Sequence, residues 1–303
     1  MNVRWLSGRT FGVLAAAPLV LAAVLTGMPP GGASASTCVG WTGVQPPNPS
    51  SSVNVFSGVA ALSSCNAWAA GYYDNGTADQ TLIEHWNGTA WSQEPSPNPG
   101  GSANDNVLGG VAATSSSNAW AVGHYCTFSC ATPPSALDQT LIERWHGTAW
   151  SRVPSPNPGG SVNDNVLSGV AATSSSNAWA VGWYERSGTP PQTLIEHWNG
   201  TAWRQVSSPN PGGSGHLNLL DGVAATSSSN AWAVGYYDIG ATPQTLIEHW
   251  NGTAWRQVSS PNPGGSANDN FLYGVAATSP ANIWAVGSYF NGTATETLAL
   301  HCC

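Results

Sequence analysis

A tandem repeat is the feature that most constrains how this chain can fold. A Gly-Val-Ala-Ala segment begins at each of Gly58, Gly110, Gly169, Gly222 and Gly274. An Asn-x-Trp turn follows each copy, and the first four copies continue through a Thr-Leu-Ile-Glu segment to a second tryptophan pair and a proline-rich stretch. The copies are spaced by 52, 59, 53 and 52 residues. A fixed period of this length is typical of propellers and stacked arrays, so the repeat sets the architecture.

Each repeat reads as four short β-strands. The segments Val-Ala-Ala, Trp-Ala-Val-Gly, Thr-Leu-Ile-Glu-His-Trp and Thr-Ala-Trp supply one strand each, and prolines such as Pro95 and Pro97 end the fourth because they cannot donate to a ladder. The Asn87-Gly88 pair between the third and fourth strands predicts a two-residue hairpin turn. No segment has a helical period. The chain is therefore expected to be all-β, with four-stranded blades.

The two ends of the chain are complementary. The last repeat stops after its third strand, and residues 41–49 align with residues 91–99, which hold a fourth strand. We therefore expect a five-bladed β-propeller whose ring is closed by the N-terminal strand, since an open array would need capping repeats. The expected parts are residues 38–49 (outer strand of blade five), 50–97, 98–156, 157–209 and 210–261 (blades one to four) and 262–303 (the rest of blade five).

The first 35 residues have the pattern of an export signal. Arg4 and Arg9 precede an apolar run, residues 11–27, and Ala33 and Ala35 supply a small-x-small cleavage pattern. We expect cleavage after Ala35 and a secreted mature chain, 36–303, without a membrane span. That chain has five arginines and no lysine against 15 acidic residues, a formal charge of −10. Such a surface excludes extensive phosphate contacts, so nucleic acid is not an expected partner.

Six cysteines in an exported chain indicate disulfides. A local Cys126–Cys130 bridge is expected in the enlarged loop of blade two, although His124 together with these cysteines leaves a zinc site as the alternative. Cys38, Cys302 and Cys303 fall at the interrupted hairpin of blade five, and Cys65 lies in a turn at the same end of blade one. The pairing among these four stays open. No metal and no cofactor is expected.

The repeated tryptophans and the Glu-His pairs favour structural roles. Trp86 and Trp91 are expected on one face of the hairpin, where they pack between blades, with sugar stacking as the alternative. The histidines are spread one per blade, so they cannot gather around one metal.

Candidate ligand-binding residues lie at one end of the propeller. The loops between the second and third strands vary most in sequence, and variable loops on a rigid scaffold commonly carry recognition. The tyrosines that lead into these loops are Tyr73, Tyr125, Tyr184, Tyr237 and Tyr289, and Trp183 is an off-pattern tryptophan beside them. An asparagine precedes each first strand, at Asn54, Asn106, Asn165, Asn218 and Asn270. These amides indicate either a ring that binds a ligand or cation, together with Asp105, Asp164 and Asp269, or capping of the loops.

The repeat resembles the kelch-like propeller repeats of secreted bacterial proteins, in which Trp-Ala-Val-Gly precedes His-Trp-Asn-Gly-Thr-x-Trp. The resemblance covers residues 38–303 and implies the fold rather than an activity. A single glycine, such as Gly71 or Gly123, stands where kelch repeats usually carry a pair. The architecture is also similar to that of five-bladed tachylectin-type lectins, from which no residue can be transferred.

These observations favour a secreted, monomeric, non-catalytic propeller that binds carbohydrate or a cell surface at several equivalent sites. Nearly identical blades would give avidity for a repetitive ligand. An extracellular protein-interaction scaffold is the main alternative. A glycoside hydrolase is a further alternative, but it needs two carboxylates in different environments, and the repeated aspartates offer no unique pair.

Overall fold

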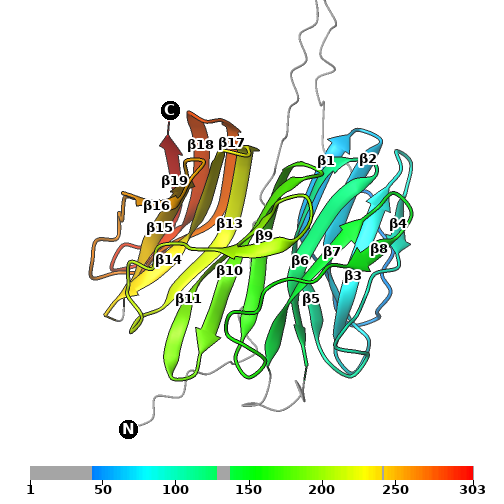
Figure 1. Cartoon of the computed structure of the whole chain (residues 1–303), viewed down its shortest axis with the longest axis horizontal. Coiled ribbons are helices and arrows are strands. Elements are labelled where there is room, and N and C mark those ends of the chain that lie inside the picture. Colours follow the sequence, from blue (N-terminus) through cyan, green and yellow to red (C-terminus); the bar gives the residue numbers. More distant parts are fainter. Residues whose placement is uncertain (1–42, 128–136, 241, 303) are drawn as a thin grey trace, which may run out of the picture.

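The chain folds into a five-bladed β-propeller made of antiparallel sheets. The computed structural model describes residues 43–127, 137–240 and 242–302, and among these residues no helix occurs. Figure 1 shows the sheets following one another in sequence order, with the first and last sheets on opposite sides of the view. No helix within the described ranges is long and apolar enough to cross a membrane. The predicted export signal lies outside these residues.

Every sheet is a meander, in which strands adjacent in sequence pair with one another. Blade one contains β1 (Asn54–Ser63), β2 (Asn66–Asp74), β3 (Asp79–Trp86) and β4 (Trp91–Glu94). Blade two contains β5 (Asn106–Ser115), β6 (Asn118–Cys126), β7 (Asp138–Trp145) and β8 (Trp150–Arg152). Blade three contains β9 (Asn165–Ser174), β10 (Asn177–Arg186), β11 (Thr189–Trp198) and β12 (Trp203–Val206). Blade four contains β13 (Asn218–Ser227), β14 (Asn230–Ile239), β15 (Thr242–Trp250) and β16 (Trp255–Val258), and blade five contains β17 (Asn270–Ser279), β18 (Asn282–Phe290) and β19 (Thr295–Cys302).

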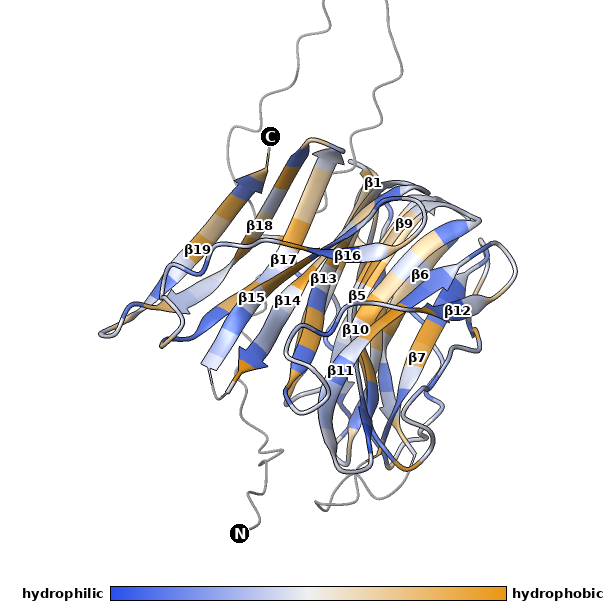
Figure 2. Cartoon of the chain, turned by 60° about the vertical axis from the view of Figure 1, so that its left-hand side comes forward, coloured by the Kyte–Doolittle hydropathy of each residue, from blue (hydrophilic) through white to orange (hydrophobic). Residues whose placement is uncertain are grey.

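The hydrophobic core lies between neighbouring blades. Trp68 of β2 packs with Ile83 of β3 against Leu108, Leu141 and Trp150 of blade two. The same arrangement recurs between blades two and three and between blades three and four. Figure 2 shows that apolar residues are concentrated on the strands. The tryptophans Trp68, Trp120 and Trp179 are completely or almost completely buried, as expected for residues that hold blades together.

The repeated histidines are part of the same interfaces. His85 stacks on Trp68 with ring centroids 4.3 Å apart, and its Nε2 lies 3.0 Å from Oδ1 of Asn66. In blade two, where Arg144 replaces histidine, the guanidinium donates to Oδ1 of Asn118 and lies over the Trp120 ring. Each of these side chains is therefore held by an asparagine and a tryptophan of its own blade.

The first strands approach one another closely along the inside of the blades. A Cβ added to Gly58 would lie 3.1 Å from Cα of Gly110, and one added to Gly222 would lie 3.0 Å from the carbonyl oxygen of Tyr273. Gly58, Gly169 and Gly222 are thus required by the neighbouring backbone rather than by their own conformation.

The hairpin between the third and fourth strands differs from the predicted two-residue turn. Trp86 pairs directly with Trp91, so residues 87–90 form a four-residue loop. Oδ1 of Asn87 accepts hydrogen bonds from the backbone N–H groups of Thr89 and Ala90, and only Gly88 of this loop has a positive φ, 98°. The asparagine side chain closes the turn here, so the short primed turn predicted from Asn-Gly is wrong.

Blade five has three strands among the described residues. Its predicted fourth strand falls partly on residues 38–42, which lie outside the described ranges, and residues 43–49 have no strand pairing. An apolar groove of about 180 Å³ is present beside β19, lined by residues including Trp232, Ile247, Ile283 and Leu300. Closure of the ring by the N-terminal segment therefore stays a prediction.

Candidate functional site

The tyrosines that lead into the variable loops are mostly walls of the blade interfaces. Tyr125 packs against the core between blades one and two, and Tyr184 and Tyr237 do the same at the next interfaces. Nη2 of Arg152 donates a hydrogen bond of 2.7 Å to the Tyr125 hydroxyl, and its guanidinium lies 4.6 Å from the ring centre. These half-buried rings therefore serve the packing of the blade interfaces.

Trp183 and Tyr73 are not among the residues that pack against these cores. Trp183 is half-buried on β10, between Val166 and Thr193 of the neighbouring strands. Tyr73 is half-buried on β2 opposite Asn54. Tyr289 packs against the blade four–five core, and its hydroxyl donates to a carboxylate oxygen of Glu296.

The five repeated asparagines cap the loops that lead into the first strands. Oδ1 of Asn106 accepts the N–H of Gly100 at 2.8 Å, and its Nδ2 donates to the carbonyl oxygens of Gly101 and Asn104. The equivalent bonds are made by Asn165, Asn218 and Asn270, and Asn54 bonds both backbone groups of Ser50. Loop capping, the structural alternative, therefore accounts for the polar groups of these amides.

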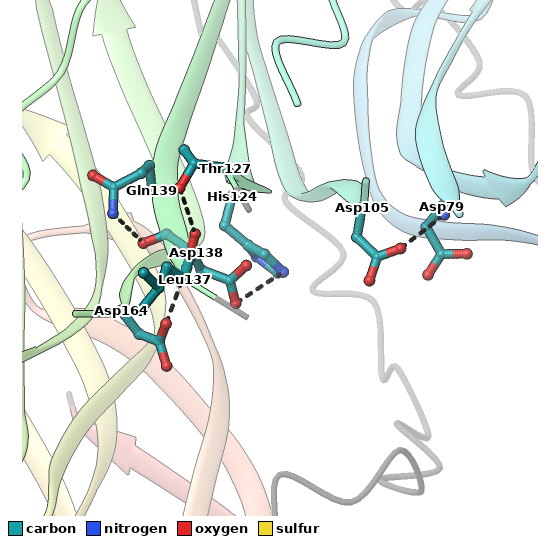
Figure 3. A network of polar contacts seen from close by, with 8 residues as sticks. All are labelled: Asp79, Asp105, His124, Thr127, Leu137, Asp138, Gln139 and Asp164. Atoms are coloured by element: carbon teal, nitrogen blue, oxygen red, sulfur yellow. Dashed lines mark hydrogen bonds and ion pairs between the residues drawn. The ribbon is translucent and has the colours of Figure 1, made fainter. Parts of the chain in front are cut away.

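The repeated aspartates beside these asparagines connect neighbouring blades. Oδ1 of Asp105 in blade two accepts the backbone N–H of Asp79 in blade one at 3.0 Å, and Asp164 accepts that of Asp138 at 2.9 Å (Figure 3). Burial raises the pKa of Asp164 above its ordinary value. Blade three carries Pro191, which has no N–H, and the next blade has Leu217 in place of the aspartate, whereas blade four carries Pro243 and the next blade keeps Asp269.

A pocket of about 330 Å³ lies at the loop end of blades one and two. Its lining includes Val53, Tyr72, Asp74, Asp79 and Asp105. It therefore joins the variable loop between β2 and β3 to the loop that precedes β5. An aromatic ring and carboxylates on a rigid frame are a combination suited to a polar ligand with an apolar face.

The groups of this pocket are fixed by the fold. Oδ1 of Asp74 accepts the N–H of Gly76 at 2.6 Å, and its Oδ2 accepts a hydrogen bond from the Ser52 hydroxyl at 3.4 Å. Burial raises the pKa of Tyr72, and the nearby Asp79 carboxylate raises it further, so the phenol stays protonated and can donate. The carboxylates act as acceptors, and their backbone partners orient them.

The pocket is not repeated with the same chemistry. The position of Tyr72 is occupied in the other blades by His124, Trp183, Tyr236 and Ser288. In blade two, Nε2 of His124 lies 4.0 Å from Oδ2 of Asp138 (Figure 3). The position of Asp79 is occupied by Asp138, Pro191, Pro243 and Thr295. The near-identity of the blades therefore does not extend to these pocket residues.

Tyr72, Asp74 and Asp79 were not among the residues predicted from the sequence. The prediction followed Tyr73, which recurs as tyrosine in every copy, whereas the pocket uses its neighbour. The available signal was variability, because the Tyr72 position changes in chemistry between otherwise similar repeats, and only Trp183 was recognised as departing from the pattern.

The cysteines are described only in part. Cys126 is buried and disulfide-bonded, so its sulfur is not a thiolate available to a metal. Cys38, Cys130 and Cys303 lie outside the described residues, and Cys65 and Cys302 are exposed free thiols. The described parts of the chain contain no group of three or more potential metal ligands. The predicted pairings stay predictions.

Comparison with known proteins gives neither a family nor a function. No family profile matches the chain, and no curated protein matches it. Similar solved structures include YCF48 bound to D1 peptide (15% identity, TM-score 0.41, 80% of this chain and 66% of that one). They also include the Hadza microbial sialidase Hz136 (10% identity, TM-score 0.49, 80% of this chain and 51% of that one). A third is an α-L-arabinanase from Penicillium chrysogenum (9% identity, TM-score 0.44, 78% of this chain and 71% of that one). The chain spans at most two thirds of the length of the first two, and the low identities carry no argument about function.

Proposed function

We propose that this protein is a secreted, non-catalytic carbohydrate-binding propeller whose principal site is the pocket of Tyr72, Asp74, Asp79 and Asp105. The observation that carries the proposal is the meeting of a tyrosine side chain with several carboxylates in one pocket between two blades. Sugars present alternating apolar faces and hydroxyl groups, so they need an aromatic surface with hydrogen-bond acceptors beside it. The export pattern of residues 1–35 supports an extracellular setting.

A binding role suits the pocket better than hydrolysis. Asp105 accepts a backbone N–H from Asp79, and Asp74 accepts one from Gly76, so both carboxylates already stabilise loop geometry. Glycoside hydrolysis needs one carboxyl group kept protonated and a second one ionised beside the scissile bond. The kelch-like character of the repeats contributes nothing to this distinction, because no functional residue comes with it.

A glycan array probed with the mature chain, 36–303, tests the proposal. We expect binding that free sugar competes and that Tyr72→Ala abolishes. Trp183→Ala is the matched control, because it removes an aromatic side chain from the equivalent position of blade three, beside Pro191 rather than a carboxylate. Binding retained in Tyr72→Ala would contradict the assignment of the site.

The same preparation distinguishes binding from hydrolysis and from protein recognition. Release of reducing sugar that is lost in Asp105→Asn would show an enzyme and overturn the non-catalytic proposal. A blank array, together with specific capture of one extracellular protein that Tyr72→Ala abolishes, would replace the carbohydrate with a protein ligand.

A further inference from the structure

Each first strand carries two register shifts, and the first of them is a β-bulge at the same point of every repeat. This bulge falls between Phe56 and Gly58 in β1 and at the corresponding places in β5, β9, β13 and β17. The bulged residues are Ser57, Gly109, Ser168, Asp221 and Tyr273. Bulges are often found where a side chain is re-aimed toward a functional site.

The bulge residues line the inner side of the blades. Each one directly precedes a glycine at which neighbouring first strands nearly touch. All five are at least partly reachable by water, whereas Leu108, Leu167 and Leu220, each just before its bulge, are completely or almost completely buried. Innermost strands of a propeller surround its central channel, so these side chains face that channel.

Asp221 is the carboxylate in this set, and it lacks a compensating charge. Its Oδ2 is buried without a hydrogen-bond partner among the described residues. Burial raises the pKa of Asp221 to about 7. A desolvated carboxyl group without a partner is costly unless a ligand satisfies it.

Aromatic rings surround the same place. The Tyr236 and Phe271 ring centroids lie 4.7 Å apart, and those of Phe271 and Tyr273 lie 5.9 Å apart. The Asp221 carboxylate and the Tyr273 hydroxyl both raise the pKa of Tyr236, so these groups are close in space. The Tyr273 hydroxyl is also 3.2 Å from Oγ of Ser288. One carboxylate and three rings from blades four and five therefore meet at the channel.

We infer that Asp221, Tyr236, Phe271 and Tyr273 form a second binding site, which takes the organic ammonium group of an amine. A carboxylate beside several aromatic faces is the arrangement that attracts an alkylated ammonium ion, because the ring faces carry negative charge density. A single carboxylate offers too few oxygen ligands for a calcium or magnesium ion. The site is separate from the Tyr72 pocket and does not depend on the function proposed for it.

Among the described residues, neither arginine nor lysine is one of the groups that act on Tyr236. The titratable groups facing Tyr236 are Asp221 from β13, Tyr273 from β17 and Asp238 from β14 itself. His216, at the loop before β13, acts on Asp238. The mature chain contains no lysine, so a bound amine would supply a positive charge beside Asp221 that no lysine of the chain provides.

Calorimetric titration of the mature chain with choline tests this inference, with 3,3-dimethylbutan-1-ol as the uncharged control of similar shape. We expect choline to bind and the alcohol to bind much more weakly. At pH 7 choline binding should also release protons, because a cation displaces the proton of Asp221, and titrations in two buffers of different ionisation enthalpy measure that release. Nα-acetyl-lysine amide, run in parallel, distinguishes a free amine from a protein lysine as the natural source of the ammonium group.

Asp221→Asn should weaken binding about tenfold or more and abolish proton release. Asp221→Ser should do the same, and it is expected to fold because serine occupies this position in blades one and three. Glu94→Gln, which removes one negative charge from β4 of blade one, should leave binding unchanged. The inference is overturned if no amine binds at millimolar concentration, if the alcohol binds as well as choline, if both Asp221 variants bind normally, or if Glu94→Gln weakens binding equally.

Discussion

Trp68 of blade one lies edge-to-face against Trp150 of blade two, with ring centroids 5.2 Å apart and ring planes at 86°. The same relationship joins Trp120 to Trp203 (5.1 Å, 87°) and Trp179 to Trp255 (5.1 Å, 89°). This geometry matches the electrostatics of aromatic rings, since the positive edge of one meets the negative face of the other. The blades are therefore joined by one aromatic contact that recurs at each of these interfaces.

Removing that contact should weaken the protein substantially. Trp203→Ala leaves a cavity at a fully packed interface, so we expect the free energy of unfolding to fall by about 3–5 kcal/mol. Denaturant-induced unfolding followed by circular dichroism measures the change. Val162→Ala, at a residue that is 67% exposed, is the control and should have little effect. A loss as small as that of the control would show that the tryptophan pair does not hold the blades together.

Stability should fall as the pH rises. Glu143, Glu196 and Glu248 are fully buried, and burial raises their pKa values well above the ordinary range. Such carboxyls are protonated in the folded protein, and their stabilising contribution, complete below a pH of about 4.5, is lost as the pH rises toward the folded pKa. Burial raises the pKa of Glu84 only to about 7. The loss of its contribution therefore begins near pH 4.5, as for the other three, but is complete at a lower pH, near 7.

Thermal melts from pH 4.5 to pH 8 test this prediction. Between the unfolded and the folded pKa of each carboxyl, the free energy of unfolding should fall by about 1.4 kcal/mol per pH unit. Glu143→Gln removes one titrating group at an unchanged shape, so it should reduce the slope and raise the stability at pH 8. A protein that is equally stable at both ends of this range would contradict burial of these groups as acids.

The link between Asp164 and the Asp138 N–H should be measurable by a reciprocal pair of substitutions. Asp164→Leu removes the acceptor of a partly buried N–H, so a loss of about 1–3 kcal/mol in unfolding free energy is expected. Leu217→Asp places a carboxylate where Pro191 has no N–H to donate, so it should give no gain. Stabilisation by Leu217→Asp, or a neutral Asp164→Leu, would mean that the aspartates have another role.

Much of the fold could be predicted because each repeat specifies one blade. The position of Trp68 recurs in every blade, so five sheets, their strand order and the burial of Trp68, Trp120, Trp179 and Trp232 follow from one unit. Trp284 of blade five, whose predicted fourth strand lies partly outside the described residues, is 49% exposed. The hairpin length was predicted wrongly because the Asn87 side chain, rather than a primed backbone turn, satisfies the loop N–H groups.

The candidate site was harder to predict for a different physical reason. Strand alternation separates Tyr72 from Tyr73, and only the packing of the next blade decides which of the two faces a pocket. Asp105 lies in the pocket because its Oδ1 accepts the backbone N–H of Asp79, which belongs to another repeat. A pattern within one repeat cannot predict such a contact. The channel residue Asp221 sits on a bulge, where the two-residue period is interrupted.

The groove beside β19 bears on ring closure. In blades two, three and four a fourth-strand tryptophan packs at the equivalent place, and the sequence aligns Trp41 with these residues. Trp41→Ala should therefore lower the free energy of unfolding by about 3–5 kcal/mol, as expected for a buried tryptophan. Val162→Ala, at an exposed residue, again serves as the control. A neutral Trp41→Ala would contradict closure of blade five by this segment.

The stoichiometry of glycan binding tests the central claim most directly. Native mass spectrometry of the mature chain with the best ligand from the array should show one glycan per chain, because the residues at the Tyr72 position and at the Asp79 position differ from blade to blade. Tyr72→Ala should abolish that complex, and Trp183→Ala should preserve it. Several equivalent glycans per chain, or one glycan that remains in Tyr72→Ala, would contradict a single principal site between blades one and two.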